Sequence, residues 1–443
     1  MKLLVVSNGY PPRGSFGTEF YTRELVRGLA RRGHAVSVLH PERGGARPRY
    51  TLESVQADGV PVLLLHNPGD PRKRFAESYR DEHVERVFAE LLARERPDLV
   101  HFTYLLWGLS LRLPEVARAQ GIPSVATLTD YGLLCHRGQM FDAHLARCIR
   151  TPSAAEHGLL ARAARGTAAE ALALVGGLGR VPVAADLVLR EQEVRRAFAA
   201  LALLIAPTQA FLEVFAASGV PRHKLVPLLY SFDEEPYRSV PARAASGRVR
   251  FGFLGQFAAH KGLGCLLRAA RELERLAPDS DWELCLYGQP SEGRNRRYAR
   301  AWLGALDGRR VRLCEPFAPD QASAVLAMLS ALVAPSEWDE NAPLAVLQAR
   351  AAGLPVIATD VPGIAEIVRV PEQGRLVPVG DARLLARAMH EVVSGDLRAP
   401  ISPGLPLAFE AHLARLEQLY ARVSTGQVSA GQASAGQGVT ADG

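Results

Sequence analysis

The feature that most constrains this fold is a repeated alternation of short apolar runs and amphipathic segments. Residues Lys2–Ser7 form a nearly continuous apolar run, which is typical of a strand buried on both faces. A turn rich in glycine and proline follows, and Phe20–Arg32 then carries apolar residues at helical spacing. Ala35–Leu39 is predicted to be the next strand. This order makes a βαβ unit, so the sequence predicts an α/β protein with doubly wound parallel sheets.

The alternation begins a second time at Val249–Leu254, after a polar stretch rich in proline and glycine. We therefore predict two Rossmann-like domains that face each other across a cleft. Residues 153–189 are rich in alanine and glycine and fit the alternation poorly, so we interpret them as an insertion in the first domain. The predicted segments are a first domain over 1–233, a linker over 234–247, a second domain over 248–405, a helix over 406–422 and a disordered tail over 423–443.

Composition narrows the class of protein. A chain of 443 residues is long for one core and suits two domains. The formal charge is +6, but the basic residues are scattered, which argues against a nucleic-acid partner. The five cysteines show no C-x-x-C spacing, and the first residues predict a strand instead of a signal peptide. We therefore expect a cytoplasmic protein with reduced thiols.

A membrane contact is open at this level. No run reaches the roughly 18 apolar residues that a membrane-spanning helix requires. The modest basic excess suits either anionic substrates or the anionic inner face of a membrane. The apolar insertion over 153–189 is consistent with peripheral contact there, although alanine and glycine are also typical of closely packed helices.

Two glycine turns are candidates for binding an anionic group. Gly17 lies near a predicted helix N-terminus, where free N–H groups and the helix dipole favour a diphosphate. The alternative is that Gly17 only permits a tight turn. Gly255 and Gln256 follow the first strand of the second domain, and Lys261 comes shortly after them. A lysine at this sheet edge can neutralise charge on a leaving diphosphate, although a plain surface lysine is the alternative.

The stretch around Glu340 is the third candidate. Glu340 directly precedes Asn341, Ala342, Pro343 and Leu344, where a helix is predicted to begin. Backbone N–H groups there can bind a phosphate or sugar oxygen, while the carboxylate accepts hydrogen bonds from sugar hydroxyls. Gln348 lies eight residues further on, about two helical turns, and shares a face with Glu340. The alternative is an acidic residue that only complements the helix dipole.

In this order and at these separations, the three stretches resemble the retaining GT-B glycosyltransferases of family four, the "glycosyl transferases group 1" class. The resemblance covers most of Met1–Val393, outside the insertion. The resembling stretches are NGYPPRGSFGTEFYTRELVRGLARRGHAVSVL, FGFLGQFAAHKGLGCLLRAA and WDENAPLAVLQARAAGLPVIATDVPGIAEIV, the last of which is similar to the E-x7-E donor motif of the family.

The resemblance implies a role for each matching residue. Gly17 would contact the donor diphosphate, and Lys261 would bind it and assist departure of the nucleotide. Glu340 would hold donor-sugar hydroxyls, with Asn341–Leu344 beside the sugar and phosphate, while Gln348 would contact the ribose. The implied activity is transfer of a hexose, with retention and without metal or cofactor, from a UDP- or GDP-sugar to a saccharide or lipid-linked acceptor.

Four positions depart from the family pattern. Gln348 replaces the second glutamate, Gln256 stands where many members have an arginine, Phe16 replaces a glycine, and Thr129 stands at the position of a frequent active-site histidine. Asp130 is either an acceptor-side group or a helix cap. These departures keep open a non-catalytic GT-B scaffold or regulatory protein. A nucleotide-sugar epimerase is not favoured, because such enzymes need additional carboxylates and histidines around the sugar.

Overall fold

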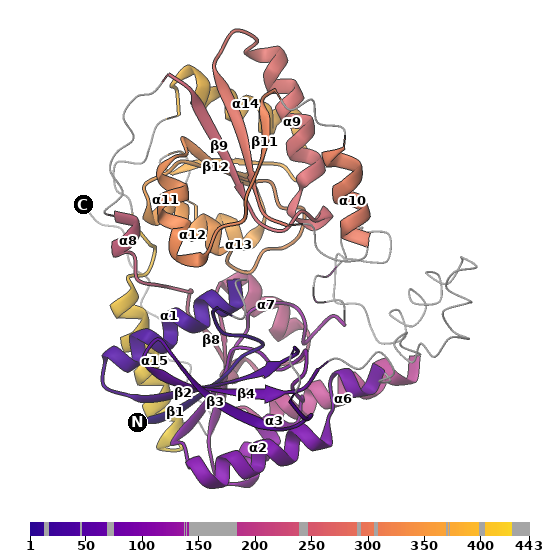
Figure 1. Cartoon of the computed structure of the whole chain (residues 1–443), viewed down its shortest axis with the longest axis vertical. Helices are drawn as coiled ribbons and strands as arrows, with labels where there is room; N and C mark the ends of the chain where they lie inside the picture. The colour runs from indigo at the N-terminus through magenta and orange to yellow at the C-terminus, as the bar shows by residue number, and fades with distance from the viewer. Residues whose placement is uncertain are drawn as a thin grey trace.

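The chain folds into two α/β domains, with the N-terminal domain below and the C-terminal domain above in Figure 1. The computed structural model describes residues 1–12, 17–44, 47–68, 75–136, 138, 140, 184–238, 247–289, 294–304, 309–368, 371, 373–397 and 404–427. Each domain is built around its own mostly parallel sheet, which confirms the predicted fold class.

The N-terminal sheet has the strand order β3-β4-β2-β1-β5-β6-β7-β8, and within it only β3 runs antiparallel to its neighbour. Its strands are β1 (Lys2–Val6), β2 (Ala35–Glu42), β3 (Leu52–Ala57), β4 (Val60–His66), β5 (Leu99–Phe102), β6 (Ser124–Thr127), β7 (Leu203–Ala206) and β8 (Leu225–Pro227). The β3–β4 hairpin was not predicted. Asp58 and Gly59 make its turn, both at positive φ, so the Asp-Gly pair was the missed signal.

The helices of this domain lie on both faces of the sheet (Figure 1). They are α1 (Gly17–Arg31), α2 (Glu82–Glu95), α3 (Leu113–Ala119), α6 (Ala184–Ala200) and α7 (Gln209–Ala217). Helix α2 begins after Asp81, whose carboxylate accepts from the His83 and Val84 amides. Most of the predicted insertion over 153–189 lies outside the described residues, and its last part belongs to α6.

The C-terminal sheet is wholly parallel, with the order β11-β10-β9-β12-β13-β14. Its strands are β9 (Val249–Leu254), β10 (Trp282–Tyr287), β11 (Val311–Cys314), β12 (Ala331–Ala334), β13 (Val356–Thr359) and β14 (Gly374–Val377). Its helices are α9 (Leu263–Leu276), α10 (Arg294–Leu303), α11 (Ala322–Ala327), α12 (Leu344–Ala351), α13 (Pro362–Ala365) and α14 (Ala382–Ser394). The strand order reverses between β9 and β12, and ligands of such sheets bind beyond the carboxyl ends of the strands at that point.

The last helix returns to the first domain. Helix α15 (Phe409–Ser424) packs against α1, as Figure 1 shows. A Cβ atom at Gly28 of α1 would lie 2.7 Å from side-chain atoms of Phe409 and Leu413, so glycine permits this close approach. A helix therefore lies where one was predicted over 406–422. It spans Phe409–Ser424, so it extends two residues into the predicted tail, and it belongs to the core of the N-terminal domain. Residues 428–443 of the predicted tail lie outside the described residues.

Two buried histidines join α15 to the N-terminal sheet. The His101 ring bonds the Tyr420 hydroxyl at 2.6 Å and the Thr127 hydroxyl at 2.7 Å. The His412 ring bonds the Tyr21 hydroxyl at 3.2 Å and the Leu229 carbonyl at 2.9 Å. Burial disfavours the charged ring, so it lowers the pKa of His101 to about 3 and that of His412 to about 4.

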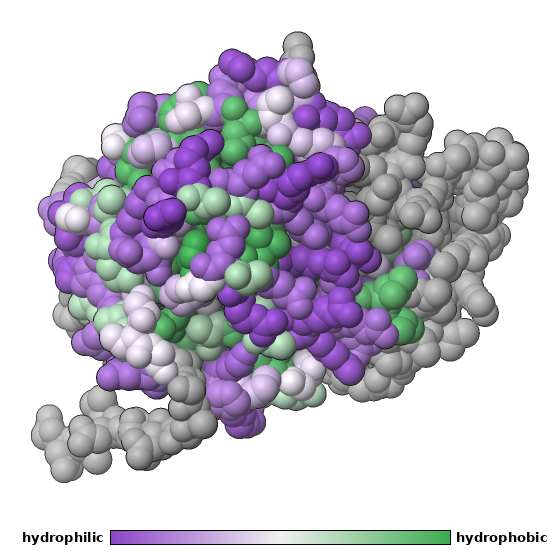
Figure 2. All heavy atoms as spheres, turned by 90° about the horizontal axis from the view of Figure 1, so that it is seen from below, coloured by the Kyte–Doolittle hydropathy of each residue, from purple (hydrophilic) through white to green (hydrophobic). Residues whose placement is uncertain are grey.

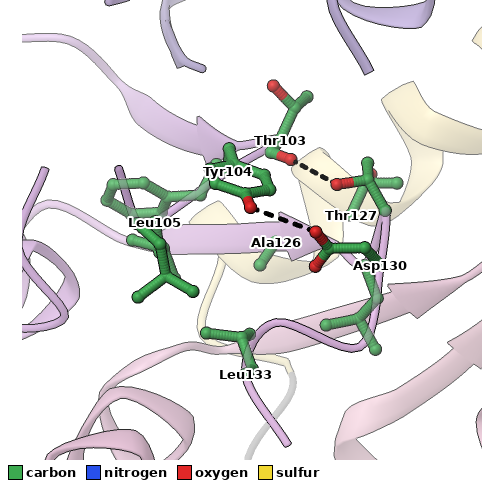
Figure 3. Close-up of a pocket in the computed structure, with 11 residues that line it drawn as sticks. Thr103, Tyr104, Leu105, Ala126, Thr127, Asp130 and Leu133 are labelled. Carbon is green, nitrogen blue, oxygen red and sulfur yellow. Dashed lines mark hydrogen bonds between the residues drawn. The ribbon is translucent and has the colours of Figure 1, made fainter. Parts of the chain in front are cut away.

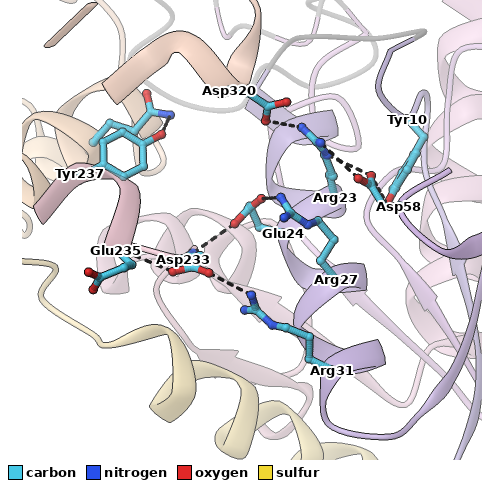
Figure 4. Close-up of polar contacts among 11 residues, drawn as sticks. Tyr10, Arg23, Glu24, Arg27, Arg31, Asp58, Asp233, Glu235, Tyr237 and Asp320 are labelled. Atoms are coloured by element: carbon cyan, nitrogen blue, oxygen red, sulfur yellow. Dashed lines mark hydrogen bonds and ion pairs between the residues drawn. The ribbon is translucent and has the colours of Figure 1, made fainter. Parts of the chain in front are cut away.

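Helix α1 also contacts the segment that leads from the N-terminal to the C-terminal domain, at Asp233, and the C-terminal domain itself (Figure 4). Arg23 of α1 pairs with Asp58 of the β3–β4 turn at 2.9 Å and with Asp320 of the C-terminal domain at 2.6 Å. Arg31 pairs with Asp233 at 2.9 Å, just before the short helix α8 (Glu235–Arg238). Residues 239–246 of the predicted linker lie outside the described residues.

Within the described residues, no helix is both long and apolar enough to cross a bilayer. Seen from below, the molecule presents mostly hydrophilic residues, with apolar ones in separated spots (Figure 2). Peripheral contact through residues 153–189 stays a prediction, because most of that segment is not described.

We predict that mild acid destabilises the fold through these histidines. Unfolded histidine binds a proton below about pH 6.5, whereas folded His101 and His412 stay neutral until about pH 3 and 4. The stability that neutral burial contributes is therefore complete above pH 6.5 and is lost as the pH falls below it, by about 1.4 kcal/mol per pH unit for each histidine. Urea unfolding at neutral pH and at about pH 5 measures this loss.

The matched control is His83→Gln, because the His83 side chain is 58% exposed. This variant should keep the full pH dependence, whereas His412→Gln should make it shallower at a lower absolute stability. Equal unfolding free energies of the wild type at both pH values would contradict the prediction.

Candidate active site

Two loops meet at the carboxyl ends of β9 and β12. Gly262 has φ +72°, and a Cβ atom there would lie 1.7 Å from the Pro335 carbonyl oxygen. The Glu337 amide donates to the His260 carbonyl at 2.8 Å, which ties the loops together beside that contact. Glycine is therefore required where the β9 loop crosses the β12 loop. This crossing places Lys261 beside the acidic stretch that follows β12.

Lys261 and Glu340 form an ion pair at this crossing. The Lys261 Nζ atom lies 2.6 Å from Glu340 Oε1, and the Ser336 hydroxyl donates to the same oxygen at 2.5 Å. Glu340 is 3% exposed, whereas about a quarter of the Lys261 side chain is reachable by solvent. The ammonium also lies 4.8 Å from the centre of the Trp338 ring. The pair thus has a buried anion and a cation that an incoming ligand can reach.

Helix α13 packs directly against the backbone of Glu340. A Cβ atom at Gly363 would lie 1.8 Å from the Glu340 carbonyl oxygen, so any larger residue there must displace the Glu340 loop. The Thr359 hydroxyl donates to the Ser336 carbonyl at 2.6 Å, which fixes the beginning of the same loop. These contacts orient the carboxylate without help from a ligand.

Asn341 connects this motif to the N-terminal domain. Its side-chain amide donates to the Thr129 carbonyl at 2.5 Å and lies 3.2 Å from the Tyr230 hydroxyl. Its own carbonyl accepts from the Thr208 hydroxyl at 2.9 Å. The structure therefore brings the predicted donor residue Asn341 against the predicted acceptor-side residue Thr129. Ala342 is buried beside them.

A pocket opens next to this contact at the carboxyl ends of β5 and β6 (Figure 3). The Tyr104 hydroxyl donates to Asp130 at 3.0 Å, and the Gly132 amide donates to the other carboxylate oxygen at 2.7 Å. Burial raises the pKa of the Asp130 carboxyl. Asp130 thus accepts within a turn of the pocket wall, and the helix-cap alternative has no helix to cap among the residues described around it. The pocket is lined by Phe102, Thr103, Tyr104, Leu105, Leu106, Ala126, Thr127, Leu128, Thr129, Asp130 and Leu133.

Gly17 lies where the two domains approach each other. It is the first residue of α1, and a Cβ atom there would be 3.4 Å from a methyl group of Leu344. Pro343 caps α12, which begins at Leu344, so the N-termini of α1 and α12 are close together. The first N–H groups of a helix have no partner within the helix, which suits an anion. Phe16 lies outside the described residues.

The remaining predicted residues have structural neighbours of their own. The Gln348 amide donates to the Tyr237 hydroxyl of α8 at 2.9 Å. The Gly255 amide donates to the Tyr287 carbonyl at 3.0 Å, and the Gln256 carbonyl accepts from the Ala258 amide. Gln348 is therefore buried against α8, whereas Gly255 and Gln256 form backbone hydrogen bonds in the loop after β9.

Sequence reasoning missed several residues of this site. Ser336, Tyr230 and Thr208 have no local pattern that sets them apart, because their role depends on contacts between distant segments. Trp338, one of only four tryptophans, lies two residues before Glu340 and was the available signal. Among the described residues, no three histidine, cysteine, aspartate or glutamate side chains gather as metal ligands would.

Comparisons with known proteins match both halves of the chain. Residues 16–230 match the family model "Glycosyl transferase 4-like domain", and residues 248–394 match the model "Glycosyl transferases group 1". A D-inositol 3-phosphate glycosyltransferase of Rhodococcus opacus (strain B4) is 36% identical over 149 residues, which cover 33% of this chain and 33% of that protein. The amylovoran biosynthesis glycosyltransferase AmsK of Erwinia amylovora is 25% identical over 45% of this chain and 50% of its own. The chain thus matches about a third of the length of the inositol phosphate enzymes.

Solved structures share the architecture over nearly the whole chain. Sucrose-phosphate synthase from Thermosynechococcus elongatus superposes with a TM-score of 0.63 at 16% identity, over 96% of this chain and all of the other. Anabaena HepE in complex with UDP and glucose gives 0.58 at 16% identity, over 96% and 98%. The two domain models follow each other in chain order and fall on the two observed sheets, so each half of the chain is similar to a glycosyltransferase domain, and the chain has the GT-B fold.

Proposed function

We propose that this protein transfers a hexose from a nucleotide-sugar donor to a saccharide or lipid-linked acceptor, with retention of configuration at the sugar. The observation that carries the proposal is the Lys261–Glu340 pair, which lies at the strand-order reversal of the C-terminal sheet. The neighbouring Asn341 touches the wall of the N-terminal pocket. A donor bound at the Lys261–Glu340 pair would therefore lie beside an acceptor bound in the N-terminal pocket.

The donor diphosphate has a ready cation in Lys261. About a quarter of the Lys261 side chain is reachable by solvent, and its ammonium is held at 2.6 Å from Glu340. A diphosphate carries more negative charge than one carboxylate, so it can draw the ammonium toward itself and neutralise charge as the nucleotide leaves. The N-termini of α1 at Gly17 and of α12 at Leu344 add N–H donors nearby. HepE, whose structures contain UDP-glucose or UDP, supports a UDP-hexose as the first donor to test.

Glu340 would hold the donor sugar. When the diphosphate takes Lys261, the buried carboxylate needs new hydrogen-bond donors, because an unpaired buried charge is costly. Sugar hydroxyls supply such donors. Binding of the sugar and binding of the diphosphate are then coupled through the same ion pair, and Asn341–Leu344 border both groups.

The transfer step needs no protein nucleophile. The bond from the anomeric carbon to the diphosphate oxygen breaks while a bond forms from that carbon to the acceptor hydroxyl on the same face of the sugar. The proton of the hydroxyl passes to the leaving diphosphate oxygen, so charge and atoms balance. Thr129 and Asp130 would position the acceptor in the N-terminal pocket.

The first functional prediction separates the two partners of the ion pair. Lys261→Ala removes the cation, so nucleotide diphosphate affinity should fall by about one to two decades. Glu340→Gln leaves the lysine in place, so its loss should fall on kcat, by about 10- to 100-fold. Calorimetry with UDP and GDP, combined with steady-state kinetics, measures both effects.

Lys2→Ala is the control. Lys2 is the first residue of β1, whereas the candidate site lies beyond the carboxyl ends of the strands, and it forms a partly exposed pair with Glu95. Thermal unfolding checks that Lys261→Ala, which strands a buried carboxylate, is still folded. Near-normal turnover in Glu340→Gln would instead favour the non-catalytic scaffold.

The second functional prediction concerns metals. Because we assign charge neutralisation to Lys261, turnover should persist in excess EDTA at close to the untreated rate. The assay uses product separation after incubation with each candidate nucleotide sugar. Loss of turnover on chelation, with recovery on adding manganese or magnesium, would contradict a metal-independent mechanism.

The third functional prediction concerns Gln348. If this side chain accepts from a ribose hydroxyl, a charged acceptor should bind that hydroxyl more tightly by about 1 kcal/mol. Gln348→Glu should therefore tighten nucleotide binding several-fold in calorimetry. Tyr237→Phe removes the 2.9 Å partner of Gln348 and controls for a change in that contact alone. Unchanged affinity in Gln348→Glu together with weaker binding in Tyr237→Phe would count against a ribose contact.

A further inference from the structure

Trp107 is displayed to solvent beside the N-terminal pocket. Its side chain is 61% exposed, whereas Trp282 and Trp338 are 3% and 8% exposed. It directly follows Leu105 and Leu106, which line the pocket after β5. Exposing a large aromatic ring forgoes burial energy. Its position at the end of a pocket-lining segment therefore calls for a reason.

The backbone that presents this ring is strained and firmly held. Trp107 has φ 59°, a left-handed conformation that a bulky side chain rarely adopts. Arg43, just after β2, donates to the Trp107 carbonyl at 2.7 Å, and Asn67, just after β4, donates to the Gly108 carbonyl at 3.0 Å. Strain of this kind persists where the surroundings impose it, and it concentrates at ligand sites.

The Trp107 ring is in contact with the Arg43 guanidinium. The Arg43 guanidinium carbon lies 5.4 Å from the ring centre, in a cation–π contact. The high exposure of the ring leaves its remaining surface available to a ligand. Tyr104, three residues earlier in the same segment, donates from its hydroxyl to Asp130 inside the pocket. The segment after β5 therefore carries both a polar group of the pocket and the exposed ring.

We propose that Trp107 and Arg43 form a second saccharide subsite at the entrance of the acceptor pocket. A pyranose has an apolar C–H face that packs on an aromatic ring, and its edge hydroxyls accept hydrogen bonds from a guanidinium. The reacting sugar would occupy the pocket near Asp130, and the next sugar of the acceptor would stack on Trp107. This inference rests on the proposed glycosyltransferase function, and it assigns the acceptor to saccharides of at least two sugar units.

A membrane contact is the competing occupant, because tryptophan is also common at bilayer interfaces. Insertion of Trp107 would carry the adjacent Arg43 guanidinium toward the hydrocarbon, which is unfavourable. A saccharide instead satisfies the ring and the guanidinium together. The geometry thus favours a polar ligand with one apolar face.

The test compares Trp107→Ala, Trp107→Phe and the control Leu313→Ala, which truncates a 56% exposed side chain in the C-terminal domain. Calorimetry measures binding of cellobiose, maltose, lactose and gentiobiose, with the methyl glycosides of glucose and galactose as single-sugar probes. We expect Trp107→Ala to weaken disaccharide binding by about fivefold to tenfold and Trp107→Phe to retain most of it. Single-sugar binding should change less, and Leu313→Ala should match the wild type.

Binding of UDP and GDP is measured on the same samples, so a failure of the donor assignment is seen separately. Equal disaccharide affinity in wild type and Trp107→Ala would overturn the subsite, as would a wild type that binds none of the four disaccharides. Flotation with anionic and neutral vesicles covers the competing occupant. Vesicle recovery that drops in Trp107→Ala while saccharide affinity is unchanged would assign the ring to a membrane.

Discussion

The buried pairing of Lys261 with Glu340 is the interaction on which the site depends. Taking a carboxylate out of water costs several kcal/mol, and the attraction of a cation offsets this cost only when the geometry is good and further hydrogen bonds are made. Here the ammonium at 2.6 Å and the Ser336 hydroxyl at 2.5 Å satisfy the same oxygen. Such a pair adds little stability compared with apolar packing. Its value lies in keeping two charged groups in place until a ligand with complementary charge replaces one of them.

That pairing is possible because glycines let backbone segments touch. Gly262 admits the Pro335 carbonyl where the β9 and β12 loops cross, and Gly363 admits the Glu340 carbonyl above α13. Each contact would be blocked by a single methyl group, so both positions require glycine. The strand-order reversal brings the two loops to the same edge of the sheet. The glycines then allow these loops to approach closely enough for Lys261 and Glu340 to pair.

The parts of this fold that the sequence predicts are those with local causes. Alternation of apolar runs and glycine turns predicts the strand Val249–Leu254 to the residue and a helix over Phe20–Arg32, where α1 spans Gly17–Arg31, because burial on a sheet and one apolar helix stripe are local patterns. The β3–β4 hairpin was missed, since its edge strand Leu52–Ala57 is mixed in polarity. An amphipathic pattern predicts α15 but not its partner, because docking depends on the opening at Gly28 far away in the chain. The contact of Asn341 with Thr129 likewise joins residues that no spacing relates.

Polar contacts join the two domains at several places. Glu366 of the C-terminal domain accepts from the Gln209 and Ala210 amides, both at 2.7 Å, and so caps α7 of the N-terminal domain. Arg23 joins Asp320 on another side. These exposed contacts are individually weak and screened by salt. The Asn341–Thr129 bond is partly buried and lies between the Glu340–Leu344 motif and the pocket. Asn341, whose carbonyl also accepts from the Thr208 hydroxyl, thus links the Glu340 motif to the N-terminal domain at the pocket wall.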